Sequence, residues 1–285
     1  MPLRVFSDSA KTFESVNDFL VDPTTPHGLF TIMHRGLPID FRYEDRGHAT
    51  TTVFFHAALG PKITRLPVFL GKSFSQDVAV NRLFVADPTL HIDDKLRLAW
   101  YAGSSRQPDL QEVLAQVFAK ISGSNRTIYF GASGGGYAAL YYSAQHPSSL
   151  AIPLNPQTNI ARYVPAFVER WASMAWQLEK SESGHLEMPD TVTNLVEVYE
   201  QPRGNHVLYV QNTGDALHME AHWSPFIEKV NPSNDIVPFL QFVGEGHVPP
   251  PVEQLKELLK LAAASQDWST LDVLPQTLAI GMEVR

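Results

Sequence analysis

The chain has 285 residues, of which 44% are hydrophobic and 18% charged, and its formal net charge is −8. This composition is typical of a soluble globular protein, and the acidic balance without any run of Lys or Arg argues against a nucleic-acid binder. Because the chain has no cysteine, disulfides, thiolate metal sites and cysteine nucleophiles are excluded. The N-terminal residues lack the apolar core of a signal peptide and no apolar run could span a bilayer, so we expect a cytoplasmic protein.

Along the first hundred residues the pattern predicts one helix followed by short strands. Residues 9–21 carry apolar side chains at helical spacing, with Ser9 as the cap and two prolines after the end. A glycine turn at 36–38 separates the first two strands, which we therefore expect to pair antiparallel. Residues 96–101 fit a strand and a helix equally well. The expected strands, each rich in β-branched or aromatic residues, are 28–33, 39–43, 50–55 and 82–86.

From residue 110 onwards, strands alternate with helices. The expected elements are helices at 110–121 and 252–264 and strands at 128–130, 150–154, 207–211 and 236–243. Residues 159–205 have a mostly helical pattern without a strand, so we expect a small helical cap inserted between two core strands. The alternation predicts one α/β domain over residues 1–285, with a mostly parallel sheet, helices on both faces and a leading antiparallel hairpin.

The most informative motif follows the strand at 128–130. Gly131-Ala-Ser-Gly-Gly135 fits the pattern G-x-S-x-G, and a helix is expected from Tyr137 onwards. In a strand-turn-helix setting this pattern is typical of a nucleophile elbow, where glycines permit a sharp turn and the serine projects at a helix N-terminus. The five residues alone fit a glycine-rich turn with Ser133 as a cap equally well. A phosphate-binding loop is the third alternative, but its Gly-Lys-Ser/Thr ending and the G-x-G-x-x-G register are both missing.

Residues further along the chain decide between these alternatives. In a parallel sheet, catalytic groups gather at the carboxyl ends of the strands. Asp215 and His247 each follow an expected strand, the histidine within the loop Gly244-Glu-Gly-His247. The chain order Ser, Asp, His is that of the α/β-hydrolase architecture. The chain therefore resembles α/β-hydrolase fold proteins over roughly residues 28–264.

A second resemblance rests on two other segments. They are the run Ser133-Gly-Gly-Gly-Tyr-Ala-Ala-Leu140 and the later Asn155-Pro-Gln-Thr158. Together they are similar to segments of α/β-hydrolase-like proteins of bacterial glycan O-acetylation. This resemblance implies a glycan as the acceptor of an acyl group.

The hydrolase resemblance implies a catalytic triad. Ser133 would be the nucleophile, His247 the general base and then acid, and Asp215 the carboxylate that orients the histidine. These residue types suit the chemistry, because a serine hydroxyl is a poor nucleophile near pH 7 and needs a base to accept its proton. A buried carboxylate then sets the tautomer of the histidine and stabilises the imidazolium.

Two backbone donors would hold the oxyanion of the tetrahedral intermediate. One is the N–H of Gly134, directly after the nucleophile. The other is expected in the loop after His56, where the register makes Ala58 the first choice and Ala57 the next. The family often has glycine at the position of Ala57, so the chain departs from the family pattern in this loop.

Each acid or base has a structural alternative. Asp215 would be an ordinary cap for the helix that follows it, and Glu220 and Asp235 are alternatives for the acid. His247 would be a turn-capping residue in the structural interpretation, but a Gly-x-Gly-His loop after a strand favours the catalytic one.

Two further histidines, His218 and His222, lie one helical turn apart. This spacing suits a metal ion. No further ligand is marked by the sequence, so we expect these histidines on a helix face and predict no metal site.

Substrate contacts are expected from residues near the elbow. His56 ends one strand, Gln157 follows the strand beside the elbow, and Trp171 belongs to the aromatic part of the helical insertion. The structural alternatives are support of a loop for His56, a simple turn for Gln157 and core packing for Trp171.

We therefore predict a serine hydrolase that cleaves carboxylic esters through an acyl-enzyme on Ser133. It would need no cofactor or metal and would act on a small-molecule or glycan ester. The first alternative is an O-acyltransferase that uses the same triad, with a glycan hydroxyl in place of water. The second is a non-catalytic, hydrolase-like binding or assembly protein, which the three filled triad positions disfavour.

Overall fold

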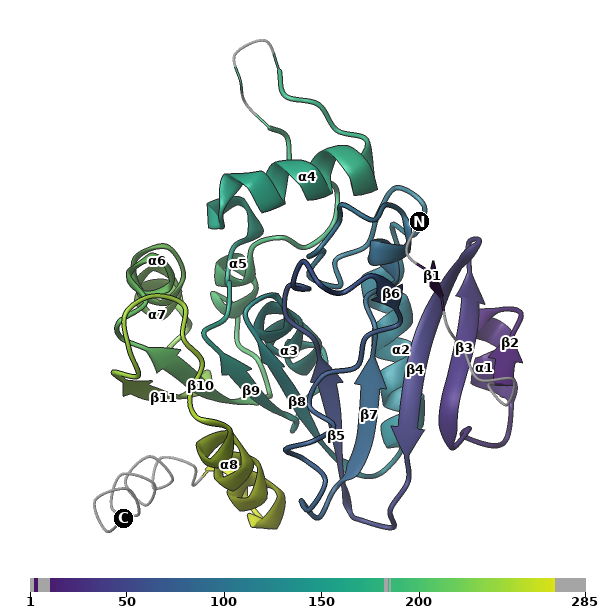
Figure 1. Ribbon diagram of the computed structural model, residues 1–285. Coiled ribbons are helices and arrows are strands. Elements are labelled where there is room, and N and C mark those ends of the chain that lie inside the picture. The colour runs from purple at the N-terminus through teal and green to yellow at the C-terminus, as the bar shows by residue number, and fades with distance from the viewer. Residues whose placement is uncertain (1–2, 5–10, 182–183, 185, 270–285) are drawn as a thin grey trace.

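The computed structural model describes residues 3–4, 11–181, 184 and 186–269. Nine strands form one sheet in the order β11-β10-β9-β8-β5-β7-β4-β3-β2, in which only β4 runs antiparallel to its neighbours (Figure 1). Its strands are β2 (Lys11–Phe13), β3 (Gly28–His34), β4 (Leu37–Glu44), β5 (Thr50–Phe55), β7 (Asn81–Val85), β8 (Arg126–Ala132), β9 (Leu150–Leu154), β10 (His206–Asn212) and β11 (Asp235–Gln241). A separate parallel pair joins β1 (Leu3–Arg4) and β6 (Arg65–Leu66).

Helices cover both faces of the sheet. They are α1 (Val16–Val21), α2 (Leu110–Ser122), α3 (Gly134–Ala144), α4 (Pro165–Trp176), α5 (Leu195–Tyr199), α6 (Ala216–His218), α7 (Ser224–Lys229) and α8 (Val252–Ala264). One core lies under α2 and α3 and includes Leu114 and Leu140, and the other lies under α8 and includes Leu258. This arrangement confirms the predicted fold class. Within the described ranges, no helix is long and apolar enough to cross a membrane.

The hydrophobic pattern placed most strands correctly. β5, β9 and α8 have the expected bounds, and β3 pairs antiparallel with β4 as predicted. The turn between them lies at Arg35 and Gly36, both with positive φ (48° and 76°), the conformation of a tight hairpin turn.

The N-terminal helix is shorter than predicted. Lys11–Phe13 form β2, which pairs parallel with β3, and α1 begins only after Ser15, which caps it. Phe13 belongs to the sheet because its buried ring packs edge-on against Phe19, with centroids 5.2 Å apart. Tertiary packing therefore outweighs the helical spacing in this segment. The cap predicted at Ser9 lies outside the described residues.

A helical segment lies between β9 and β10, where the cap was expected. It contains the 3₁₀ turn η2 (Ile160–Arg162), α4 and α5. Figure 1 shows α4 lying across the carboxyl ends of the central strands. Trp171 of α4 packs edge-on against Trp100 with centroids 5.5 Å apart, so this helix is joined to the loop beneath it.

Residues 96–101, which fitted a strand and a helix equally well, form a loop. Trp100 and Tyr101 both have left-handed backbone angles (φ 55° and 56°), which cost energy in residues with a bulky side chain. Hydrogen bonds offset this cost: the Asp87 carboxylate accepts the Tyr101 N–H at 2.7 Å, and the Tyr142 hydroxyl donates to the Tyr101 carbonyl at 3.0 Å. The loop therefore has a defined shape beside the elbow.

Candidate active site

Ser133 lies at the junction of β8 and α3. Its backbone angles are φ 56° and ψ −119°, a strained conformation that a serine adopts only where its surroundings impose it. The turn requires glycine, because a Cβ on Gly131 would lie 2.2 Å from the carbonyl oxygen of Gly135. Ser133 itself is 4% exposed. The motif thus forms the sharp strand-turn-helix geometry of a nucleophile elbow.

The start of α3 lies against the end of β5, which leads into the expected oxyanion loop. A Cβ on Gly135 would lie 2.8 Å from the carbonyl oxygen of His56, so only glycine permits this close approach. In the described part of the chain, the N–H groups of Ala57 and Ala58 have no acceptor. The first N–H groups of α3, including that of Gly134, have none within their own helix. The candidate donors therefore lie on the two segments that adjoin Ser133.

Asp215 and His247 come together beyond the carboxyl ends of β10 and β11. Nδ1 of His247 lies 2.6 Å from Oδ2 of Asp215. Asp215 is 3% exposed, whereas the side chain of His247 is 40% exposed. The other oxygen of Asp215 accepts the N–H of His218 at 3.3 Å, so the carboxylate also caps the following helix. Asp215 is therefore both the cap of the following helix and the partner of His247, so the two interpretations are compatible.

The other two carboxylates considered for the acid lie elsewhere. Asp235 begins β11, and its Oδ2 contacts Nδ1 of His206 at 2.5 Å. Glu220 is exposed to solvent. Of the three carboxylates, only Asp215 contacts His247.

Two buried asparagines hold the loop that carries His247. Nδ2 of Asn212 donates to the Gly244 carbonyl at 2.8 Å, and Nδ2 of Asn155 donates to the Val248 carbonyl at 3.0 Å. Oδ1 of Asn155 accepts the backbone N–H of Asn212 at 2.7 Å, which joins the two side chains into one support. Sequence analysis did not identify this support, although an asparagine at the ends of two adjacent strands was a visible signal.

A second histidine shares the carboxylate of Asp215. Nδ1 of His218 lies 2.9 Å from Oδ2 of Asp215, a short contact that is not a well-directed hydrogen bond. The His218 ring stacks on the ring of His247 with centroids 4.2 Å apart, and it is 1% exposed. It precedes the π-helical segment η3 (Met219–Trp223), a rare geometry that is frequent at functional sites. His218, which we expected only on a helix face, is therefore part of the candidate site.

Gln157 connects His218 to Ser133. The indole N–H of Trp100 donates to Oε1 of Gln157 at 3.1 Å, so Nε2 is the donor end of the amide. Nε2 lies 2.7 Å from Oγ of Ser133 and 2.9 Å from Nε2 of His218. Because an amide NH₂ group only donates, Nε2 of His218 accepts, and the ring proton lies on Nδ1, towards Asp215. One polar network thus runs from the carboxylate to the serine.

Ser133 bonds with Gln157 and not with His247. Burial raises the pKa of the nearby Tyr163 phenol, and an interaction with the Ser133 hydroxyl lowers it by less. Among the hydrogen bonds of the described residues, none joins Ser133 to His247. Since Nδ1 of His247 is engaged by Asp215, Nε2 is the nitrogen that remains available as a base.

Burial and hydrogen bonding set the protonation states in this cluster. Burial by itself would raise the pKa of Asp215, but hydrogen bonds from His247 and His218 hold it below its ordinary value. Burial and the neighbouring His247 together lower the pKa of His218 to about 4, although Asp215 acts in the opposite direction. Burial also lowers the pKa of His222 to about 3. Near neutral pH the cluster therefore holds an ionised carboxylate and two neutral, buried histidines.

Two of the expected substrate contacts are engaged within the protein. Nε2 of His56 accepts the Asp87 N–H at 3.1 Å, Nδ1 faces the Ala57 carbonyl at 2.8 Å, and burial lowers the pKa of this histidine to about 4. Trp171 is fully buried behind Trp100. His56 thus shapes the loop on which the oxyanion donors are expected, and a direct contact of either residue with substrate stays a prediction.

Three residues of the cluster lie close enough to hold a cation. Asp215, His218 and His247 offer ligand atoms that all lie within 4.8 Å of one another. A set of two histidines and one carboxylate suits ions such as Zn²⁺. A cation there would compete with the contacts that both Nδ1 atoms already make with the carboxylate.

Comparisons with known proteins bear on the fold. Neither the protein-family models nor the curated proteins include a match to this chain. Among solved structures, the capsule O-acetyltransferase of Neisseria meningitidis serogroup A matches with a TM-score of 0.60 at 15% identity, over 86% of this chain and 98% of that one. A mutant of that enzyme in complex with CoA also gives 0.60, at 16% identity, over 80% and 95%.

A hydrolase is among the matches as well. The S-formylglutathione hydrolase from Agrobacterium tumefaciens gives a TM-score of 0.52 at 10% identity, over 85% of this chain and 96% of that one. Both resemblances noted in the sequence are thereby confirmed at the level of the fold. The chain has the α/β-hydrolase fold.

Proposed function

We propose that the protein is a serine esterase that works through an acyl-enzyme on Ser133, with His247 as the base and Asp215 as its orienting carboxylate. One observation carries this proposal: the strained Ser133 turn at the start of α3 lies beside loops on which His247 and a buried carboxylate meet at 2.6 Å. A serine that only capped a helix would need neither the positive φ nor such a pair.

The proton of Ser133 would pass to His247. Because Nδ1 of His247 faces Asp215, Nε2 carries the lone pair that accepts the proton, and the carboxylate stabilises the imidazolium formed. Oγ then attacks the ester carbonyl, and the alcohol leaves with the proton from Nε2. Water repeats these steps on the acyl-enzyme and releases the acid. We expect the bond between Ser133 and His247 to form as substrate binds, as catalytic hydrogen bonds often do.

Gln157 would act as a positioning residue in this scheme. Its Nε2 donates to Oγ of Ser133, so the hydroxyl proton of the serine cannot point towards Gln157. The proton is thereby left for a base on another side. Trp100 and His218 hold the two ends of the amide and prevent it from flipping.

Backbone N–H groups on the two segments that adjoin Ser133 would hold the oxyanion. The N–H of Gly134 and that of Ala58, or of Ala57, are the donors that this proposal assigns. Their segments touch where Gly135 meets the carbonyl of His56, so the two donors are part of one packed unit.

Acyl transfer to a glycan hydroxyl is the second candidate. The capsule O-acetyltransferase matches the chain more closely than the S-formylglutathione hydrolase does, with TM-scores of 0.60 and 0.52. One structure of that transferase is a complex with CoA, so a CoA thioester is the acyl donor that this candidate implies. The two candidates share every step up to the acyl-enzyme and differ in whether water or a sugar hydroxyl attacks it.

A fluorophosphonate probe tests the common part of both candidates. It should label the wild-type protein on Ser133, and Ser133→Ala should abolish the labelling. Labelling that persists in the variant would move the nucleophile elsewhere, and a wild-type protein that is never labelled would favour a binding protein without catalysis.

The second step is tested with p-nitrophenyl acetate and with acetyl-CoA as donors. Each donor is offered with and without carbohydrate acceptors. An acceptor-independent turnover after the burst supports the esterase, whereas turnover that depends on the acceptor supports acyl transfer.

A further inference from the structure

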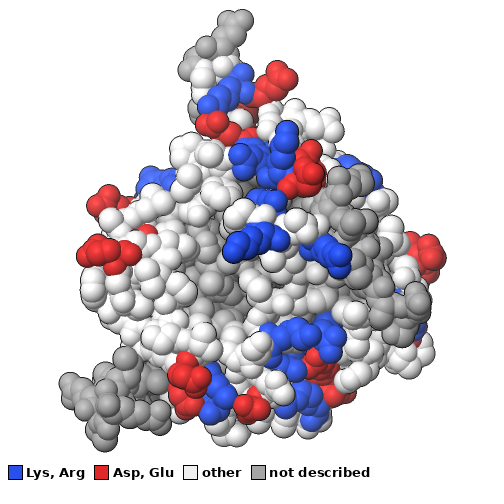
Figure 2. All heavy atoms as spheres, viewed as in Figure 1, with Lys and Arg blue, Asp and Glu red and all other residues white. Residues whose placement is uncertain are grey.

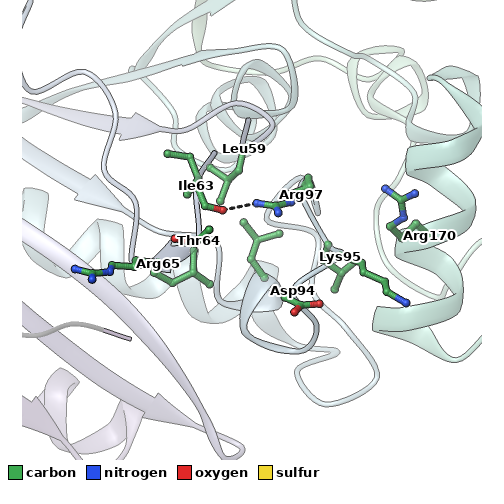
Figure 3. A pocket seen from close by; sticks show the side chains of 11 residues that line it. Leu59, Ile63, Thr64, Arg65, Asp94, Lys95, Arg97 and Arg170 are labelled. Atoms are coloured by element: carbon green, nitrogen blue, oxygen red, sulfur yellow. Dashed lines mark hydrogen bonds between the residues drawn. The ribbon is translucent and has the colours of Figure 1, made fainter. Parts of the chain in front are cut away.

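A basic cavity lies where the expected oxyanion loop continues past Ala58 to Leu59, and Figure 3 shows the side chains that line it. It has a volume of about 490 Å³. Its first wall is Leu59 with residues 63–66, its second is Leu90 with residues 94–97, and Arg170 of α4 completes the lining. The N–H of Leu59 donates to the Arg97 carbonyl at 2.8 Å, so the first two walls are joined. The first wall of the cavity thus belongs to the same loop as the proposed oxyanion donors Ala57 and Ala58, and it follows them in the chain.

The second wall leads to the nucleophile. Leu98 follows it directly, and a Cβ on Gly134 would lie 2.3 Å from Cδ1 of Leu98. Trp100, two residues further, donates to Gln157. A ligand in the cavity would therefore lie close to both sides of the Ser133 site without touching Ser133 itself.

Cations dominate the polar lining of the cavity. Four cations line it against one carboxylate, Asp94, which gives a formal charge of +3 in a chain whose net charge is −8. Without Arg65, the group of Lys95, Arg97 and Arg170 with Asp94 carries +2. Arg65 lines it as well but points to the opposite side in Figure 3. The ion pairs between described residues use other Lys and Arg side chains. Figure 2 shows Lys and Arg gathered in the middle of this face.

Arg97 is held in place without being neutralised. Its Nη1 donates to the Ile63 carbonyl at 2.5 Å and lies 3.5 Å from the Gly60 carbonyl. Backbone carbonyls orient the guanidinium but carry no full negative charge, so its other N–H groups can meet an anion. Arg170, which is exposed, projects from α4 towards the loop of Lys95 and Arg97 (Figure 3). An oriented guanidinium with further cations nearby suits the recognition of phosphate.

An apolar cavity of about 390 Å³ adjoins the basic one. The two share Leu59 and Ile63, and the apolar cavity also includes Ala58, the first choice for the oxyanion donor. Val68 and Leu70 line its other side. A ligand that filled both cavities would place an anionic group among the cations and an apolar part beside Ala58.

We propose that the basic cavity binds a phosphate group of the substrate, carried by the acyl donor or by the acceptor. The formal charge of +2 on the group formed by Lys95, Arg97, Arg170 and Asp94 matches a phosphate monoester, which carries close to two negative charges near neutral pH. The inference rests on the proposed function for the identity of the substrate, whereas binding of phosphate by the cavity does not depend on Ser133.

The binding test uses the full chain with Ser133→Ala, and inorganic pyrophosphate as the probe in calorimetry. We expect binding to one site, weakened by NaCl, and a loss of about tenfold or more in the double variant Lys95→Gln/Arg170→Gln. The control Lys229→Gln/Lys260→Gln removes the same charge from α7 and α8 and should bind as its parent does. Equal binding by the double variant and its parent, or an equal loss in the control, would overturn the proposal.

The activity test, with Ser133 intact, separates donor from acceptor. One arm compares kcat/KM for acetyl-CoA with that for a short, neutral acetyl thioester, and the other compares a phosphorylated sugar acceptor with the neutral sugar. In Lys95→Gln/Arg170→Gln we expect one of the two ratios to fall about tenfold. If pyrophosphate binding is lost but neither ratio changes, the cavity holds an adventitious ion only and the proposal is wrong. If the wild-type protein turns over no acyl donor, the proposed function fails, while the calorimetry still decides whether the cavity binds phosphate.

Discussion

The buried cluster at Ser133 and the basic cavity beside it use charge in opposite ways. In the cluster, Asp215 and His218 are almost fully buried, and each polar group contacts another group of the same network. In the cavity, Lys95 and Arg170 are exposed and belong to no ion pair between described residues. The two regions are nevertheless connected, because the loop after His56 and the loop at residues 94–100 each run from the cavity to the Ser133 site.

The difference between the regions follows from solvation. A charge that is removed from water must find its partners within the protein, so the cluster has hydrogen bonds that orient every group before a substrate arrives. An exposed cation remains hydrated and can exchange water for an anion. We therefore expect changes in the cluster to alter kcat, and changes in the cavity to alter the KM of phosphate-bearing substrates.

The largest effect should come from Ser133, the proposed nucleophile. Ser133→Ala should lower the turnover of p-nitrophenyl acetate by about ten-thousand-fold or more, because no acyl-enzyme can form. Ser173→Ala, at an exposed serine of α4, should keep the wild-type rate. A Ser133→Ala protein that is folded and retains a substantial fraction of the activity would show that the cluster is not the reacting site.

The two stacked histidines should differ in effect. His247→Ala should lower kcat by about a thousand-fold or more, since the base is lost, whereas His218→Ala should lower it by roughly tenfold to a hundredfold through the loss of positioning. Asp215→Asn should resemble His247→Ala, because the carboxylate orients that ring. Steady-state kinetics with a circular-dichroism check of folding measure all three. A larger loss in His218→Ala than in His247→Ala would exchange the roles of the two histidines.

A smaller effect is expected from the amide that connects the network. Gln157→Glu keeps an acceptor for Trp100 but removes the donor to Ser133, so kcat should fall by about tenfold. The new carboxylate would also favour protonated His218, so the acid limb of the pH profile should move to higher pH. Gln157→Met removes both polar ends and should lower kcat without that movement. Identical pH profiles for the two variants would count against the positioning role.

The smallest effect concerns stability in acid. The pKa values of His56, His218 and His222 are lowered to between about 3 and 4 in the folded chain, so the unfolded chain takes up protons first as the pH falls. Stability should therefore decrease as the pH falls from about 6.5 towards 4, by on the order of 2 kcal/mol for each such histidine.

Urea unfolding at pH 7.5 and at pH 4.5 measures this loss. His222→Asn keeps an acceptor for the Thr158 N–H and should show a smaller loss than wild type. His27→Asn, at an exposed histidine, should behave as wild type. An unchanged loss in His222→Asn would mean that this histidine is not held neutral by burial.

The local sequence pattern was sufficient to predict much of the fold and the strand ends at which the site residues lie. The bounds of β5, β9 and α8 follow from the length of apolar runs and from the residues that end them. The elbow is local as well, because crowding between Gly131 and Gly135 acts over five residues. The order of serine, acid and histidine at strand ends follows from the same reasoning.

Other features needed contacts between distant segments. Phe13 is in a strand because it packs against Phe19 and the sheet, although its spacing fitted a helix. Trp100 and Tyr101 adopt left-handed angles because Asp87 and Tyr142 hold them, and nothing in residues 96–101 alone predicts this.

The sequence by itself determined which residue types stand at the carboxyl ends of the strands, because strand ends are set by short-range patterns. Only the tertiary structure decided that His218 and Gln157 join Asp215 to Ser133, and that Lys95, Arg97 and Arg170 surround one cavity. These groups lie on separate loops and helices, and they become neighbours only when the strands pair and α4 packs over their ends. Burial then lowers the pKa of His218 and keeps that ring neutral, which no local pattern could supply.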